Sequence, residues 1–335
     1  MTPYKKLSQI QKVMPLNTLQ VDKMEGMTVR NETRVTQFIL LGLTSNPDLQ
    51  IVFFVLFLAM YLLTISGNLL IMVTIYVDCQ LHTAMYFFIC NLSVLDLSFS
   101  TITVPKALVN FFFQSKTISF GGCIAQLFFF HFIGGAECFH LTLMAYDRYV
   151  AICNPLRYTT IMNRRVCLLL VVSTWVGGFV HAFAQAFPTL QLSFCGPNEI
   201  DHYFCDAHPL SLLACSSTFA SKTADLVNSG TLTLGCFLGV FISYVYIITT
   251  VLNIRSTTGR RKAFSTCASH LLVVTLFFGP SVFTYMRPSV TFAADKMLSI
   301  FYNVMTPWLN PFIYTLRNEK GKAGKQLENI CSVAG

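Results

Sequence analysis

The sequence is poor in charge: only 11% of its 335 residues are Asp, Glu, Lys or Arg, whereas 54% are hydrophobic. A soluble globular protein carries about 25% charged residues, because its surface must be covered by polar groups. This shortage excludes a cytosolic enzyme and a nucleic-acid-binding protein, and the high hydrophobicity excludes a disordered chain. The sequence also lacks a phosphate-binding loop, a Ser/His/Asp catalytic order and a zinc-protease motif.

The chain instead contains seven long apolar runs. Residues 49–77 carry no charge, and the run is longer than the roughly 20 residues that a membrane-spanning helix needs. Six further runs follow at about 85–108, 124–146, 166–190, 224–250, 267–286 and 298–316. We therefore predict an all-α membrane protein, with a polar tail over 1–50, a seven-helix transmembrane bundle over 51–316 and a second tail over 317–335.

The distribution of basic residues predicts the orientation of this bundle. With the C-terminus inside, the inner segments (147–165, 251–266 and 317–335) hold twelve Lys and Arg residues, whereas the outer segments hold five. Basic residues of short loops prefer the cytoplasmic side of a membrane. Six basic residues in the first tail weaken this bias, but a glycosylation sequon at Asn31 agrees with an N-terminus outside and a C-terminus inside.

Three ordered strings resemble the signature of olfactory receptors, which are rhodopsin-like G-protein-coupled receptors. They are MAYDRYVAIC at 144–153, KAFSTCASHL at 262–271 and PWLNPFIY at 307–314. The shorter strings FILLG at 38–42 and LHTAMYFF at 81–88 fit the same family. The resemblance covers roughly residues 27–325 and is most similar to the fourth subgroup of the land-vertebrate class. Ala84 stands where the family usually has Pro, and Trp308 where it usually has Met.

This resemblance implies a multi-pass receptor of the plasma membrane, in contact with lipid, that binds a small odorant within the bundle. It implies activation of a heterotrimeric G protein of the stimulatory olfactory type, with no enzymatic activity, no nucleic-acid partner and no cofactor apart from a structural sodium ion. A transporter or channel is the alternative from another class, but an odd number of spans and the absence of inverted repeats disfavour it. A receptor-like chain that no longer signals is a third reading, disfavoured by the intact motifs at 147–149 and 310–311.

Arg148 lies at the inner end of the third run, where a charge is costly unless it is paired or faces a cavity. The adjacent Asp147 is the expected partner at rest, and snorkelling of Arg148 to the interface is the alternative. The resemblance implies a switch in which Arg148 turns to meet the G protein. The predicted coupling residues are Asp147, Arg148, Tyr149, Tyr244, Asn310, Pro311 and Tyr314.

Two acidic residues lie deep in the predicted bilayer. Asp96 is near the middle of the second run and Glu137 near the middle of the third, and neither has a basic neighbour in the sequence. Isolated carboxylates inside a membrane are functional candidates by default, and two that face each other bind a cation or share a proton. The resemblance places both at a sodium site, and the alternative is a pair of protonated carboxyl groups hydrogen-bonded to Ser93 or Asn310.

Residues 127, 130, 134, 137, 141, 144 and 148 recur at steps of three and four, so they share one face of the third helix. Toward the outer end this face carries a Gly134–Gly135 pair, which leaves room for a small ligand. Residues at comparable depth on the fifth, sixth and seventh helices complete a mostly apolar pocket. The predicted ligand-binding residues are Phe130, His131, Gly134, Asn228, Phe278, Ser281, Val282, Tyr285 and Asn303, with Asp225 close to Asn228. Packing between helices is the alternative role for each of them.

Four of the 12 cysteines lie in outer segments, where disulfides are stable. They are Cys123, Cys195, Cys205 and Cys215, which allow three pairings. The receptor pattern implies Cys123–Cys205 and leaves Cys195–Cys215. A metal site formed by His202, Cys205 and Asp206, with His208 close by, is the competing interpretation. The other eight cysteines are expected to be free thiols.

The first 26 residues exceed the usual tail of this family. They contain no apolar core, sequon or motif, whereas the sequence from Met27 reads like an ordinary start, with Asn31 close behind it. We therefore expect residues 1–26 to be a dispensable extension, so that a chain beginning at Met27 reaches the surface as well as the full one.

Overall fold

The computed structural model describes residues 35–113, 116–285 and 293–315. Predictions for the first 34 residues, including Asn31 and the extension, and for the tail at 317–335 lie outside this part of the chain. Within the described ranges, six helices are long and apolar enough to cross a membrane. They are α1 (Pro47–Val77), α2 (Ala84–Phe112), α3 (Phe120–Cys153), α5 (Arg164–Leu190), the continuous segment 219–252 and α9 (Thr257–Tyr285).

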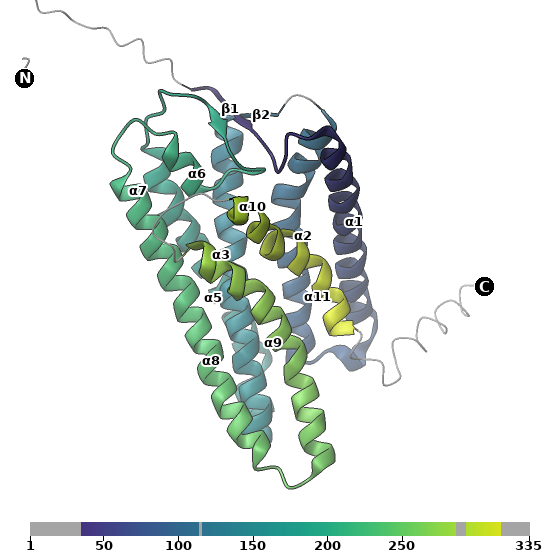
Figure 1. Ribbon diagram of the computed structural model, residues 1–335. Coiled ribbons are helices and arrows are strands. Elements are labelled where there is room, and N and C mark those ends of the chain that lie inside the picture. Colours follow the sequence, from purple (N-terminus) through teal and green to yellow (C-terminus); the bar gives the residue numbers. More distant parts are fainter. Residues whose placement is uncertain (1–34, 114–115, 286–292, 316–335) are drawn as a thin grey trace, which may run out of the picture. The chain divides into compact units, whose positions relative to one another are not determined.

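Two of the predicted spans contain a π-helical segment. The fifth span consists of α7 (Phe219–Ala224), the π-helix η3 (Asp225–Ser229) and α8 (Gly230–Leu252). The seventh consists of α10 (Ala293–Ile300), the π-helix η4 (Phe301–Met305) and α11 (Thr306–Thr315). The helices lie side by side as a bundle (Figure 1), so the predicted seven-helix fold is confirmed.

Polar residues at the ends of the apolar runs determine where the helices begin. The side chain of Asn46 accepts hydrogen bonds from the backbone N–H groups of Asp48 and Leu49, and Pro47 occupies the first turn of α1. The Ser119 hydroxyl accepts from Gly122 at the start of α3, and Asn163 accepts from Val166 at the start of α5. The inner connection between α3 and α5 contains η2 (Pro155–Arg157) and α4 (Tyr158–Ile161), and η1 (Cys79–Leu81) joins α1 to α2.

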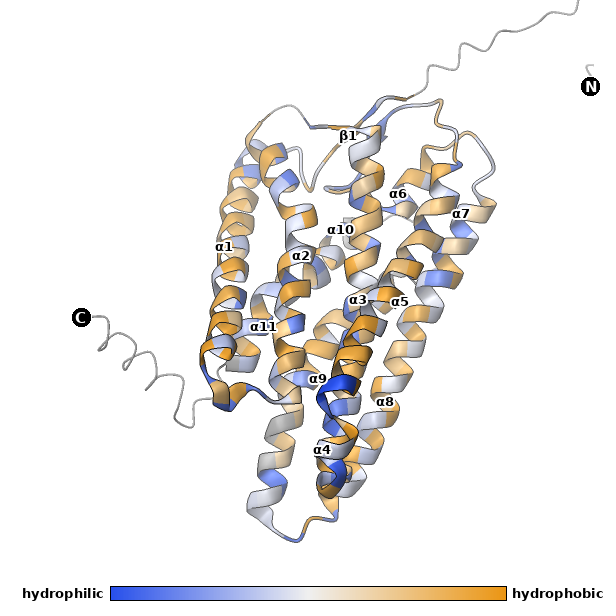
Figure 2. Ribbon diagram, turned by 180° about the vertical axis from the view of Figure 1, so that it is seen from behind, coloured by the Kyte–Doolittle hydropathy of each residue, from blue (hydrophilic) through white to orange (hydrophobic). Residues whose placement is uncertain are grey.

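Helix α3 is the central element of the bundle. It packs against α2, α5, α8 and α9, whereas most of α1 faces outward (Figure 2), where its surface is apolar. The predicted face of α3 is indeed turned inward: Phe130, Glu137 and Arg148 are all buried. Much of the rest of α3 is buried as well, although Phe129 and Tyr146 are exposed. Against α5 the approach is so close that a Cβ atom at Gly178 would lie 2.5 Å from the carbonyl oxygen of Phe132.

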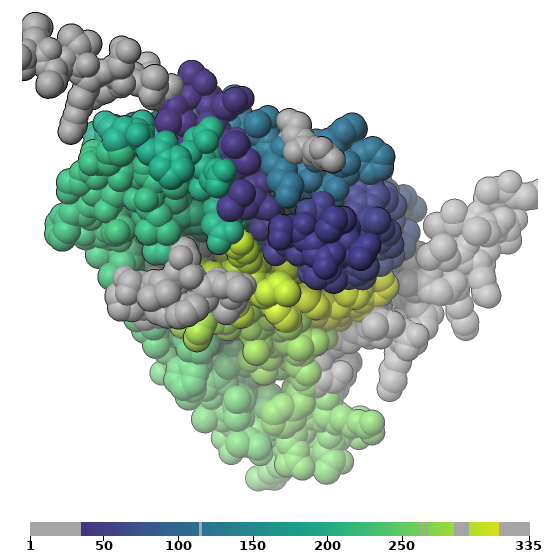
Figure 3. Space-filling model, turned by 45° about the horizontal axis from the view of Figure 1, so that its top comes forward, coloured from purple at the N-terminus to yellow at the C-terminus, as the bar shows by residue number. Residues whose placement is uncertain are grey.

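A compact cap covers the end of the bundle that the charge distribution predicts to be outer. We define it as the three-stranded sheet β1 (Gln37–Leu40), β2 (Thr117–Ser119) and β3 (Glu199–Ile200), with the loop residues 191–206 and the short helix α6 (Ala207–Leu212). Strand β1 is central, antiparallel to β2 and parallel to β3. Seen from above (Figure 3), the purple β1 segment lies between the blue connection of α2 to α3 and the teal loop.

One disulfide fixes the cap to α3, and a second joins the cap to the segment that follows α6. Cys123 at the outer end of α3 is bonded to Cys205, and Cys195 is bonded to Cys215, so the expected pairing is confirmed. Seven other cysteines of the described ranges are free thiols. The competing metal site is wrong, because the sulfur of Cys205 is already in a disulfide and the described part of the chain holds no cluster of three metal-ligating side chains.

His202 is a buried histidine in this cap. Its ring stacks on Tyr203 at 5.0 Å and meets the edge of Phe204 at 4.4 Å. Burial lowers the pKa of His202 to about 4, because the charged ring would lose its hydration; the carboxylate of Asp206 acts in the opposite direction, and the charge of Lys296 adds to the lowering. The folded cap therefore holds His202 neutral.

We predict that Cys205→Ser lowers the amount of protein delivered to the cell surface. Loss of a native disulfide costs about 2–5 kcal/mol, and this one joins the cap to α3. Surface labelling of an epitope-tagged chain measures the effect. The matched control is Cys79→Ser, which removes an exposed free thiol. Equal surface levels for the two variants would show that the tether is not needed for folding.

We also predict that mild acid destabilises the cap through His202. In the unfolded chain this ring titrates near its ordinary value, so below that pH the unfolded state binds more protons than the folded state. The stability that His202 contributes is thus complete above about pH 6.5 and decreases toward about pH 4, by about 2 kcal/mol between about pH 7 and about pH 5.

Thermal unfolding of the purified protein at several pH values measures this dependence. His202→Gln, which removes the titrating ring, should lose that part of the pH dependence. The interpretation fails if the two proteins lose stability equally on acidification.

Candidate functional site

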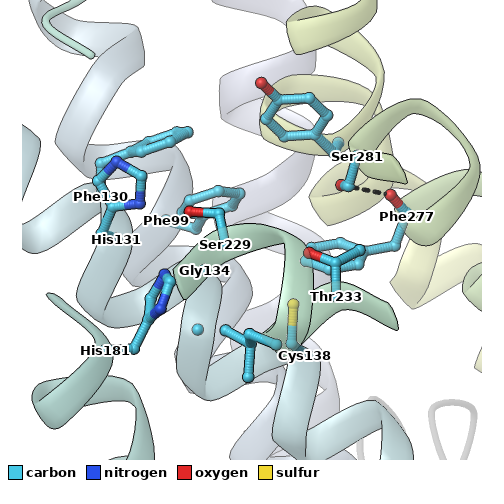
Figure 4. A pocket seen from close by; sticks show the side chains of 13 residues that line it. Phe99, Phe130, His131, Gly134, Cys138, His181, Ser229, Thr233, Phe277 and Ser281 are labelled. Atoms are coloured by element: carbon cyan, nitrogen blue, oxygen red, sulfur yellow. Dashed lines mark hydrogen bonds between the residues drawn. The ribbon is translucent and has the colours of Figure 1, made fainter. Parts of the chain in front are cut away.

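A small internal cavity lies beneath the cap, between α3, α5, the η3–α8 junction, α9 and η4 (Figure 4). Its volume is about 40 Å³, little more than one water molecule occupies in the liquid, about 30 Å³. The lining residues are Phe99, Phe130, His131, Gly134, Gly135, Cys138, His181, Ser229, Leu232, Thr233, Phe277, Ser281 and Tyr302. A molecule larger than water must therefore displace side chains in order to bind here.

Aromatic rings form the apolar wall of this pocket. Phe99 of α2 and Phe130 of α3 stack with their centroids 5.1 Å apart, and Tyr302 of η4 lies 6.4 Å from Phe130. Phe204 of the cap packs against Phe130 at 4.6 Å. The pocket thus has an apolar wall on the side of α2, α3 and η4, and the cap lies against the same ring.

The polar side chains of the pocket differ in their availability to a ligand. His131 is 3.1 Å from the carboxylate of Asp206, and the hydroxyl of Ser281 donates to the carbonyl oxygen of Phe277. By contrast, Nδ1 of His181 and Oγ of Ser229 are buried and have no hydrogen-bond partner among the described residues. An unpaired buried polar atom costs free energy, so these two atoms are the natural partners of a hydrogen-bonding ligand.

Sequence reasoning missed His181. It is the one histidine of a span without charged residues, and this was the one available signal. In the structure its ring packs on Gly135, where a Cβ atom would lie 2.9 Å from the ring. Part of the room that the Gly134–Gly135 pair was expected to leave for a ligand is thus filled by the His181 imidazole. The backbone of Gly134 faces Phe99 instead.

The structure brings together four of the nine predicted ligand-binding residues: Phe130, His131, Gly134 and Ser281. The others lie elsewhere. Asn228 donates to the carbonyl oxygen of His181 and to the side chain of Gln185, which also donates to Asp225.

The remaining four predicted residues belong to the sixth and seventh spans. Asn303 donates to the hydroxyl of Tyr203 and accepts from Thr103, so it joins η4 to the cap and to α2. Phe278 packs against Phe237 and Phe277 and does not line the cavity. Val282 is also absent from the lining, and the side chain of Tyr285 lies outside the described part of the chain.

The contact between His131 and Asp206 joins the cap directly to α3. Asp206 is buried, which by itself would raise its pKa, but the hydrogen bond from His131 and the electrostatic interaction with the His131 and His202 rings outweigh burial. The backbone N–H of Ala207 also donates to the same carboxylate. Together these contacts lower the pKa of Asp206 below its ordinary value, and the carboxylate stays ionised.

The predicted coupling residues gather at the opposite end of α3. Asp147 and Arg148 are both buried there, and the Tyr158 hydroxyl of α4 donates to Asp147 at 2.8 Å. Sequence reasoning did not anticipate Tyr158 as a partner of Asp147. Tyr149 meets Tyr246 of α8 edge to face at 5.8 Å. At this end, α3 therefore contacts both α4 and α8.

On the neighbouring helices, Tyr244 of α8 and His270 of α9 form a hydrogen bond of 2.9 Å. The other ring nitrogen of His270 lies 3.1 Å from the carbonyl oxygen of Leu141 in α3. Tyr314 of α11 is buried. Pro311 of α11 packs closely on Gly67 of α1: a Cβ atom added to Gly67 would lie 2.9 Å from the side chain of Pro311. The predicted switch positions therefore connect α3, α8 and α9, with α11 held against α1.

Asp96 and Glu137 lie in the middle of the bundle, and both are 0% exposed. The side-chain amide of Asn310 donates to both carboxylate oxygens of Asp96, at 2.9 and 3.0 Å. Asp96 is close enough to act electrostatically on Glu137. Both carboxylate oxygens of Glu137 lack a hydrogen-bond partner within the described ranges. Such a buried pair requires a cation or a proton to offset its charge.

Comparison with known proteins agrees with this arrangement. A profile of the olfactory receptor family matches residues 57–326. Olfactory receptor 4E2 of Homo sapiens is 52% identical over 298 residues, covering 89% of this chain and 95% of the relative. Its Mus musculus namesake is 53% identical over 309 residues, 91% of this chain and 100% of the relative.

Olfactory receptor 4M1 of Homo sapiens is 48% identical over 299 residues, 89% of this chain and 95% of the relative. These relatives agree with the fourth subgroup that the sequence motifs indicated. A match of this length and identity, together with the helical bundle, leaves no doubt about the family: the chain belongs to the olfactory receptors, a multi-pass family of G-protein-coupled receptors at the cell surface.

Proposed function

We propose that this odorant receptor binds its ligand in the pocket beneath the cap and signals through a stimulatory G protein of the olfactory type, which raises cAMP. The supporting observation is the position of the pocket and of Arg148 on one helix. Phe130, His131 and Gly134 of α3 line the pocket, and Asp147 and Arg148 lie buried at the inner end of the same helix. A ligand that shifts the packing of α3 acts on both regions.

The lining favours a small, mostly apolar ligand with one hydrogen-bonding group. Phe99, Phe130 and Phe277 supply apolar contact, while His181 and Ser229 each have an unpaired polar atom in the pocket. Most small-molecule sites combine an apolar lining with a few polar atoms in this way. An odorant panel applied to cells that express the chain with its trafficking helpers, read by cAMP, tests the proposal. A surface-expressed chain that never raises cAMP, with any odorant, would support the alternative of a receptor that no longer signals.

We predict that Arg148→Ala abolishes the cAMP response and leaves surface expression largely unchanged. Arg148 is buried at the inner end of α3 beside Asp147, so its loss removes the charge that is proposed to engage the G protein. Arg164→Ala is the matched control, because Arg164 is an exposed arginine of the same inner side, at the start of α5. A normal response from Arg148→Ala at an equal surface level would overturn the switch assignment.

We further propose that Asp96 and Glu137 hold a sodium ion in the resting receptor. The unpaired carboxylate oxygens of Glu137 suit this role, since oxygen ligands are those that hard cations prefer. A bound cation would neutralise part of the charge of this buried pair. Asn310 orients the carboxylate of Asp96 through both of its oxygens.

The prediction for this site is that Asp96→Asn and Glu137→Gln each reduce the dependence of signalling on sodium. Each change removes one negative charge and retains the size of the side chain. Concentration–response curves with sodium replaced by choline measure the effect. Unchanged sodium sensitivity in both variants favours the alternative, two protonated carboxyl groups, over the proposed ion.

A further inference from the structure

A second and larger hollow lies on the side of the bundle, between α3, α5 and the η3–α8 segment. Its volume is about 640 Å³, and small or apolar residues form much of its lining, among them Gly177 and Val180 of α5 and Gly235 of α8. Val180 is 60% exposed. Because both walls belong to membrane-spanning helices, this hollow opens toward the hydrocarbon of the bilayer. We call it the lateral groove.

The lateral groove and the internal pocket share part of their walls. His181 of α5 and Leu232 of α8 line both of them. These two side chains therefore lie between the bilayer-facing groove and the interior. Beyond them the pocket continues to Gly135 and Cys138 of α3.

The outer side of the pocket is closed by comparison. Tyr203 and Phe204 of the cap are 1% and 0% exposed, and Phe204 rests on the pocket residue Phe130. Two disulfides and the β1-centred sheet fix the cap in this position. On the side that the cap covers, a ligand arriving from the outer solution would have to displace this cross-linked layer. From the groove, His181 and Leu232 are the described side chains that stand between the ligand and the pocket.

We propose that the ligand enters the pocket from the membrane, through the lateral groove, with His181 and Leu232 as the gate. This inference rests on the proposed function, because it takes the pocket to be the site of a small apolar ligand. Such a ligand concentrates in the bilayer, since transfer of apolar surface out of water is favourable. The groove is large enough to hold it before it passes inward.

Opening of this gate requires side-chain motion and not separation of the helices. The backbone of His181 is held by Asn228, which donates to its carbonyl oxygen and to Gln185. Asp225 accepts a further hydrogen bond from Gln185. Nδ1 of the His181 ring, however, has no partner in the described part of the chain. Turning of the ring therefore breaks no hydrogen bond at that atom, and it changes the packing of the ring on Gly135 and His131.

The test uses the full chain in vesicles of phosphatidylcholine and a photoactivatable octanol that carries a diazirine. After mixing, samples are illuminated at increasing times, and labelled peptides are identified by mass spectrometry. The groove is read from label on α5 and α8, and the pocket from label on the α3 segment around Gly134 and Cys138. This readout does not depend on signalling, so failure of the gate and failure of the proposed function are distinguishable.

The variant that blocks the groove is Gly235→Trp. A Cβ at Gly235 meets no atom within 4 Å, so the added ring fills the groove without a backbone clash. Leu234→Trp is the matched control, because Leu234 is exposed on the same helix and lines neither cavity. We expect Gly235→Trp to slow labelling of α3 by about tenfold and to leave its final level unchanged, since a blocked route changes rates of association and not affinity.

A double variant, Cys195→Ser with Cys215→Ser, loosens the cap and should leave the rate of α3 labelling unchanged. Three results overturn the proposal: equal α3 labelling rates in Gly235→Trp and Leu234→Trp, faster labelling in the double variant, or no label on α3 of the unaltered chain at any time. If one of the first two results is obtained while signalling by an identified odorant persists, the pocket stands and only the lateral route is wrong; an unlabelled α3 contradicts the pocket as well.

Discussion

Burial of the polar residues of α3 inside the bundle is the constraint on which the rest of the structure depends. This helix carries His131, Glu137, His140 and Arg148 through the depth of a membrane, where an unpaired charge costs at least about 2.5–3.5 kcal/mol. His131 meets Asp206 of the cap and His140 meets the carbonyl oxygen of Phe88 in α2, whereas Glu137 lies near Asp96 of α2. Neighbouring helices and the cap bury these groups, and the internal pocket lies among the same elements.

The seven-helix bundle and the two disulfides follow from apolar runs and a family resemblance, and the structure and the comparisons support them. The orientation, which follows from the basic residues, stays a prediction. The transporter and channel alternative is wrong, because the chain is an olfactory receptor. Pocket residues were harder to predict. Asn228 and Asn303 were chosen for their depth in the fifth and seventh spans, but both lie in π-helical segments, where the wider turn changes the direction of each side chain.

Other differences have local causes. On α9 the pocket is lined by Phe277 and Ser281, four residues apart, so Phe278 and Val282 point elsewhere. His181 was missed because sequence gives no indication of which face of an apolar helix turns inward. Gly135, on which His181 packs, was recognised as a position without side-chain volume, but the His181 imidazole fills that space. Contacts between helices distant in sequence decide these details.

Cap, pocket and inner end thus form one chain of contacts along α3. The cap is tied to α3 by Cys123–Cys205 and by His131 with Asp206, and the pocket lies directly beneath it. At the inner end, Leu141 accepts a contact from His270 of α9, the helix that also supplies Phe277 and Ser281 to the pocket. A ligand that moves α3 relative to α9 therefore changes the contacts around the inner end of both helices.

The central claim is that the pocket beside Gly134 is the odorant site, and the most direct test is to fill it. A Cβ at Gly134 meets Phe99 at 3.4 Å, so Gly134→Leu places its side chain in the cavity. Gly121→Leu makes the same change at an exposed position of α3, where a Cβ meets no atom within 4 Å. We predict that odorant concentration–response curves, at equal surface levels, are lost or shifted at least about tenfold for Gly134→Leu and not for Gly121→Leu. Identical curves for the two variants would contradict the account.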